Sequence, residues 1–180
     1  MVGRRDRLLV FRSLRENGPA LLVPAAWLVA AATVLGVVST RALFVAHVVM
    51  SALLVAFVAA SWRDMAEGVL RTWKRVILAG TPVTLAGVAG FLALGGGLGV
   101  PPDALLAVSL YGWALLPAAG FAATRKRVEA GARIYDLGVV CCVAGAVGVA
   151  ASPSATWTAV ALAVVGVGQT AGILDATLRY

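Results

Sequence analysis

Apolar residues follow one another along this chain in long runs, not in the alternation that is typical of a half-buried strand. An α-helix needs about 20 mostly apolar residues to cross the hydrocarbon core of a bilayer. Runs of about that length cover residues 19–38, 42–62, 76–98, 104–123, 134–151 and 156–176. The pattern predicts an all-α fold, an integral membrane bundle of six transmembrane helices that occupies residues 19–178.

The segment before the first run is amphipathic. Leu8, Phe11 and Leu14 recur at helical spacing among arginines, which is the pattern of a helix that lies on a membrane surface. Gly18 suits the left-handed residue after a helix, and Pro19 suits the first turn of the next one. We therefore expect residues 1–18 to form a short cytoplasmic interfacial helix.

Two of the polar connections between runs carry opposite charges at a helical spacing. The residues are four apart in both cases, Arg63, Glu67 and Arg71 in one connection and Arg125, Glu129 and Arg133 in the other. This spacing places oppositely charged side chains on one face of a helix. Both connections are expected to continue as helix beyond the membrane.

Composition supports lipid as the solvent of much of the surface. The 180 residues are 61% apolar and 13% charged, whereas a soluble domain carries about 25% charged residues. The net charge of +7 raises the possibility of a nucleic-acid partner. The basic residues flank apolar runs and form no patch with interleaved aromatics, so we expect no nucleic acid and a bilayer with anionic headgroups instead.

The placement of the basic residues predicts an orientation. Fourteen of the 15 Lys and Arg residues fall on one side of the predicted membrane, and Arg41 alone falls on the other. Basic residues near the ends of spans are retained in the cytoplasm. Both termini are therefore expected in the cytoplasm, and the expected location is the cell membrane of a prokaryote.

The two cysteines exclude two kinds of site. Cys141 and Cys142 are adjacent within an apolar run, where neighbours on a helix point about 100° apart and do not bridge each other. A zinc site needs four ligands, and the chain adds only one histidine to these cysteines. We interpret both as small packed residues and expect no metal site.

His47 is the first candidate for an intramembrane polar site, because ionisable groups at membrane depth are costly and often functional. It lies inside the second run, away from the run's ends. A proton relay, a contact to a quinone and a haem ligand are the functional interpretations. The alternative is a neutral imidazole bonded to a backbone carbonyl or to a Ser or Thr. No cofactor is expected, with haem or quinone at His47 left open.

Three further polar residues complete the candidate site. Asp136 and Asp175 lie near the cytoplasmic ends of the fifth and sixth runs, and their spacing predicts ion pairs with Arg133 and Arg179. A role as coupling carboxylates is the alternative. Gln169 is the uncharged polar residue expected to be most deeply buried.

Glycines in the runs predict close contacts between helices, because a residue without a side chain lets another backbone approach. The glycines singled out for packing are Gly87, Gly90, Gly145, Gly148, Gly168 and Gly172. A helix interrupted around a substrate is the alternative for the glycine-rich third run.

No catalytic motif is present in the sequence, so an enzyme is not expected. The favoured hypothesis is a non-enzymatic membrane subunit or assembly partner, with a membrane protein or a second copy of the chain as its partner. A small oligomeric transporter or channel that uses a broken third run and His47 is the second hypothesis. A redox or quinone-linked membrane component is the third.

Overall fold

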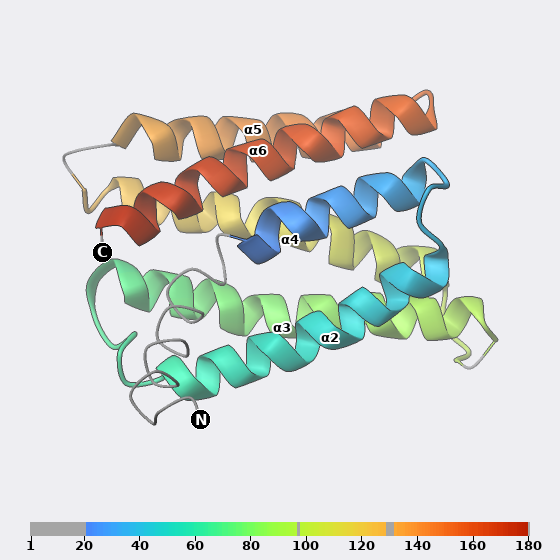
Figure 1. The fold of residues 1–180 in the computed structure, drawn as a ribbon, viewed down its shortest axis with the longest axis horizontal. Coiled ribbons are helices and arrows are strands. Elements are labelled where there is room, and N and C mark those ends of the chain that lie inside the picture. Colours follow the sequence, from blue (N-terminus) through green and yellow to red (C-terminus); the bar gives the residue numbers. More distant parts are fainter. Residues whose placement is uncertain (1–20, 97, 129–131, 180) are drawn as a thin grey trace, which may run out of the picture.

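The computed structural model describes residues 21–96, 98–128 and 132–179, and its regular elements in these ranges are all helices. They are a first helix, Leu21–Val34, and the longer helices α2 Thr40–Ser61, α3 Gly68–Leu94, α4 Pro102–Arg125, α5 Ala132–Ala150 and α6 Ala155–Arg179 (Figure 1). The predicted all-α fold is confirmed. The interfacial helix expected within residues 1–18 lies outside the described residues.

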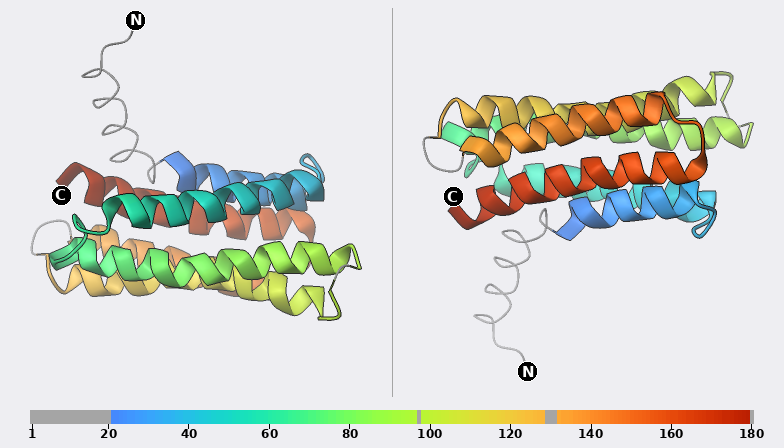
Figure 2. Two further views of the ribbon diagram at one scale, coloured as in Figure 1. Left: turned by 90° about the horizontal axis from the view of Figure 1, so that it is seen from below. Right: turned by 90° about the horizontal axis from the view of Figure 1, so that it is seen from above.

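The helices run up and down a single bundle. The connections after α2 and α4 and the end of α6 lie at one end of the bundle, and the turns after α3 and α5 lie at the other (Figure 1). α3, α4 and α5 form one layer, and α6, the first helix and α2 form the second (Figure 2). α2 packs on α3, whereas α6 packs on α5 and α4.

Within the described residues, five helices, α2 to α6, are long and apolar enough to cross a membrane. Large apolar side chains such as Val37, Val147 and Val167 are more than half exposed. Exposed apolar surface on this scale marks contact with a membrane or a partner, and lipid accounts for it here. The chain is a multi-pass, membrane-type helical protein.

The first helix ends sooner than its apolar run. Gly36 has φ +73°, its amide donates to the carbonyl of Thr33 at 3.0 Å, and the amide of Val37 donates to the carbonyl of Ala32 at 2.9 Å. This pair of bonds is a Schellman cap, which satisfies the last carbonyls of a helix. The span predicted to reach residue 38 therefore closes at Val34.

The helical continuation predicted for the two charged connections is correct only in part, because residues 68–75 belong to α3 whereas residues 62–67 and 126–128 are not helical. α2 ends at Ser61, and α3 begins at Gly68, whose φ of +59° does not belong to a right-handed helix. Arg63 and Glu67 therefore do not share a helical face. α4 likewise ends at Arg125 and α5 begins at Ala132, while Glu129 lies outside the described residues.

α3 is longer than its predicted span and continuous. It begins at Gly68 instead of residue 76, and it passes through Pro82 without a break. It ends at Leu94, where Gly95 and then Gly96, with φ +79°, reverse the chain. The glycine run therefore ends the helix and does not interrupt it.

Charge is segregated along the bundle. We call the end that holds the connections after α2 and α4 the basic end. The basic residues of the described chain that lie at or near it are Arg63, Arg71, Lys74, Arg75, Arg125, Lys126, Arg127 and Arg133. Arg41 begins α2 at the opposite end. Which end faces the cytoplasm stays a prediction.

Candidate functional site

Gln169 of α6 is the centre of a buried set of hydrogen bonds. Its side chain is 1% exposed. Its Oε1 accepts from the indole Nε1 of Trp27 in the first helix at 2.9 Å. Its Nε2 donates to the backbone carbonyl of Trp113 in α4 at 2.8 Å and lies 3.7 Å from Sγ of Cys142 in α5. One amide therefore joins four helices.

Trp113 carries the same set of bonds across to α3. Its indole Nε1 donates to Oγ1 of Thr84 at 2.8 Å, and that hydroxyl donates to the carbonyl of Gly80 at 3.0 Å. The ring of Trp113 lies over Gly80, where an added Cβ would be 2.6 Å from it. Every helix except α2 thus takes part in the network formed by Trp27, Thr84, Trp113, Cys142 and Gln169, which we call the Gln169 network.

The groups of the Gln169 network suit a structural role. An amide offers one acceptor oxygen and two N–H donors, and the oxygen and the nitrogen of Gln169 both have partners. Amide, indole and hydroxyl groups stay neutral near pH 7. Satisfied polar groups of this kind hold helices in one arrangement, because breaking the set would leave buried donors and acceptors without partners.

Glycines provide the close approaches around this network. A Cβ at Gly145 would lie 2.7 Å from the carbonyl oxygen of Ala161, and one at Gly148 would lie 3.0 Å from the Cβ of the same alanine. Three other candidate glycines also have a close neighbour from another helix. These neighbours are Leu106 at Gly90, Cys141 at Gly168 and Phe121 at Gly172. The structure therefore places these five glycines against other helices of the same chain.

The sixth candidate glycine, Gly87, lies beneath His47. A Cβ at Gly87 would be 2.9 Å from Nε2 of His47 and 2.6 Å from Oγ of Ser109 in α4. Nδ1 of His47 lies 2.9 Å from the carbonyl oxygen of Leu43. A carbonyl only accepts, so in this bond Nδ1 donates. The ring meets Phe91 edge-on at a centroid distance of 5.2 Å.

This geometry does not fit haem ligation by His47. Iron would have to bind Nε2, because Nδ1 faces a carbonyl oxygen. The ring edge formed by Cδ2 and Nε2 lies against Gly87 of α3, which leaves no room for a porphyrin on Nε2 in this packing of α2 and α3. The bond to the carbonyl of Leu43 is the one expected of an imidazole bonded to a backbone carbonyl.

The two candidate aspartates are not brought to His47 or to Gln169. Asp136 at the start of α5 forms its ion pair with Arg125 at the end of α4, where the spacing predicted Arg133. Both members of this pair are about half exposed. Asp175 is half-buried near the end of α6, and the side chain of its predicted partner, Arg179, is outside the described part.

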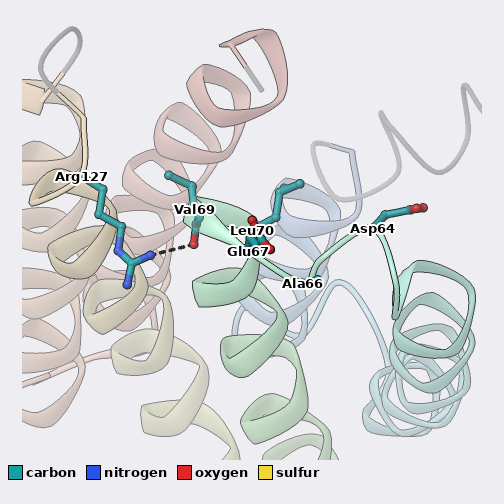
Figure 3. A pocket seen from close by; sticks show the side chains of 7 residues that line it. Asp64, Ala66, Glu67, Val69, Leu70 and Arg127 are labelled. Atoms are coloured by element: carbon teal, nitrogen blue, oxygen red, sulfur yellow. Dashed lines mark hydrogen bonds between the residues drawn. The ribbon is translucent and has the colours of Figure 1, made fainter.

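An open hollow of about 660 Å³ lies at the basic end (Figure 3). Arg127 reaches across it, and its Nη1 donates to the carbonyl of Gly68 at 2.9 Å. The carboxylates of Asp64 and Glu67 belong to exposed residues on its rim. The bond ties the connection after α4 to the start of α3, which is a structural role.

Sequence reasoning identified Gln169 but missed its partners. The missed residues of the network, Trp27, Thr84 and Trp113, lie in three different helices. The available signal was that buried indole nitrogens need acceptors, and a buried glutamine offers one. Comparisons with models of protein families, with curated proteins and with solved structures find no match to this chain.

Proposed function

We propose that the protein is a non-enzymatic subunit or assembly partner in a cell membrane, and that α2 is the helix that meets the partner protein. The observation that carries the proposal is the low burial of α2. In its most apolar 18-residue window none of the residues is buried, whereas 44% of the corresponding window of α6 is buried. α2 packs on α3 and takes no part in the Gln169 network.

The exposed face of α2 supports this choice. Ala52, Ala56 and Ala60 are spaced four residues apart and exposed, with Val45 and Val49 continuing the same face. Small residues at this spacing let a second transmembrane helix approach closely, and such packing drives association in lipid. We call this set of five residues the α2 face.

The polar interior supports a structural role over transport. The buried side chains of the Gln169 network bond to one another and to backbone carbonyls. The second hypothesis depended on a third helix broken around a substrate, and α3 is continuous. The small-residue face on the outside of the bundle is the feature that the first hypothesis needs.

Site-specific photo-crosslinking tests the proposal in intact membranes. A photoreactive residue replaces Val49 on the α2 face or, as the control, Val140 on α5, since these valines are 51% and 61% exposed. We expect one adduct of defined mass from position 49 and none from position 140. Ala56→Leu should abolish that adduct, because the larger side chain blocks close approach.

Two results would contradict the proposal. Equal crosslinking from both positions would mean that α2 meets only the same neighbours as the rest of the surface. An adduct of twice the mass of the chain would mean self-association, which the oligomeric transporter requires. Separately, labelling of single cysteines at positions 63 and 126 from inside the cell only would support the proposed cytoplasmic location of the basic end.

A further inference from the structure

A groove runs along the seam between α2 and α3 on the surface of the bundle. It has a volume of about 350 Å³ and is lined by Val55, Val58 and Ala59 of α2 and by Leu78, Thr81 and Pro82 of α3. Its polar lining group, the hydroxyl of Thr81, donates to the carbonyl of Ile77 in its own helix at 3.0 Å. The groove therefore presents hydrocarbon to whatever occupies it.

We call the side of the groove nearest the basic end its opening, and an ammonium group lies one helical turn beyond the lining residues on that side. Lys74 precedes Leu78 by one helical turn, and Trp62 directly follows α2. Nζ of Lys74 donates to the carbonyl of Trp62 at 3.2 Å and lies 4.4 Å from the centroid of its ring. An ammonium has three donors, so this arrangement holds the charge in place and still offers donors to a ligand.

The charge at this opening favours an anion. Arg63 adjoins Trp62 in the sequence, and Arg75 adjoins Lys74 and is exposed. The acidic residues of the same connection, Asp64 and Glu67, line the separate hollow beneath Arg127. Each basic residue near a membrane surface attracts anionic lipid by about 1 kcal/mol, and here the basic residues adjoin an apolar groove.

We propose that one anionic phospholipid binds here, with an acyl chain in the groove between α2 and α3 and its phosphate at Lys74. The apolar lining matches the chain, and the ammonium beside an indole matches a headgroup at the depth where tryptophans lie in membranes. The groove borders the α2 face but is lined by different residues.

Quenching of tryptophan fluorescence by brominated lipid tests the proposal on the full chain in detergent. The probe is phosphatidylglycerol with brominated acyl chains, and brominated phosphatidylcholine is the zwitterionic comparison. We expect saturable quenching with about fivefold tighter binding of phosphatidylglycerol, which corresponds to one charge at the membrane surface. Trp62→Phe should remove the quenched component, since Trp62 lies at the opening and is 52% exposed.

Matched variants separate this site from general attraction to the basic end. Lys74→Gln should weaken binding of phosphatidylglycerol about fivefold, whereas Lys126→Gln, an equal loss of charge at an exposed position after α4, should leave it unchanged. Ala59→Leu fills the groove and should weaken binding of both lipids. Ala60→Leu adds the same side chain to the neighbouring exposed position and should not.

Three results would overturn the proposal. They are equal binding of the two lipids, an equal effect of Lys74→Gln and Lys126→Gln, and an equal effect of Ala59→Leu and Ala60→Leu. Unchanged quenching in Trp62→Phe would also place the lipid elsewhere. All five substitutions fall on residues with solvent- or lipid-accessible surface, and thermal unfolding followed by circular dichroism verifies that each variant is folded. Crosslinking from Val49 remains an independent measurement of the partner proposal.

Discussion

α6 and α2 are the most and the least buried of the five long helices, and their apolarity runs in the opposite order. α2 has a hydropathy of 2.5 and none of its window buried, whereas α6 has a hydropathy of 1.6 and 44% of its window buried. In a soluble protein the more apolar helix would be the inner one. In lipid, apolar side chains gain nothing by leaving the solvent for the interior of the protein.

What distinguishes α6 is small and polar residues. Gly166, Gly168 and Gly172 admit Trp27, Cys141 and Phe121 at distances that a side chain would prevent, and Gln169 bonds across helices. In α2, the side chains of His47 and Ser51 bond to backbone carbonyls of their own helix instead. Ser51 donates to the carbonyl of His47 at 2.9 Å, for example. Helix association in this bundle thus follows close packing and hydrogen bonds, as expected without a hydrophobic driving force.

The largest loss of stability is expected from a substitution at the close contact between α5 and α6. Gly145→Val would place its Cβ 2.7 Å from the carbonyl oxygen of Ala161 and closer still to Val165. Overpacking of this kind costs about 3 kcal/mol, measured as the free energy of unfolding in mixed micelles. Gly99→Val is the control, because Gly99 has no neighbour within 4 Å. An equal loss in both variants would show that the contact does not hold α5 to α6.

The second largest loss of stability is expected from Gln169→Leu. The free energy of unfolding should fall by about 2 kcal/mol, because buried groups are left without partners. The indole of Trp27 and the carbonyl of Trp113 lose the amide that joins them. Trp27→Phe removes the orphaned donor, so the double variant should lose less than the sum of the single variants. Additive losses would mean that the two side chains do not interact.

A smaller effect is expected at the single histidine. His47→Leu loses the bond to the carbonyl of Leu43 and the edge contact with Phe91, and an aromatic contact contributes about 1 kcal/mol. Thermal unfolding of the purified variant measures the loss. A destabilisation as large as that of Gln169→Leu would mean that His47 contributes as much to stability as Gln169. The polar residues of α2 and α6 would then not differ in their contribution to stability.

The smallest effect is expected on the α2 face. Ala56→Leu changes an exposed residue, so the free energy of unfolding of the isolated protein should change by no more than about 0.5 kcal/mol. The same variant should lose crosslinking from position 49 in membranes. A large destabilisation of the isolated protein would show that Ala56 packs within the chain.

The boundaries of most helices follow from residues close in sequence. α2, α4 and α5 begin and end within a few residues of the runs 42–62, 104–123 and 134–151. Local caps explain the exceptions, since the left-handed Gly36 closes the first helix early. The burial of Gln169 was also predictable, because a polar residue among small ones within a span favours an interhelical contact.

Partners were not predictable in the same way. The spacing within α5 favoured Arg133 for Asp136, but the bundle brings Arg125 from α4 to it. Trp27 reaches Gln169 across 142 positions of sequence. Such pairs depend on how each helix is rotated about its axis and on which helices are neighbours, and hydropathy carries neither piece of information.

The order of residues along the chain was enough to predict which segments are helices, where most of them end and where charge accumulates, because these depend on each residue's preference for lipid, water or a particular backbone angle. The packing of the helices was needed to show that α6 is central and α2 peripheral, that the candidate glycines pack within the chain, and that Lys74 lies one helical turn beyond the lining of an apolar groove. These features arise from the relative rotation and order of the helices, which are set by contacts between residues far apart in the chain.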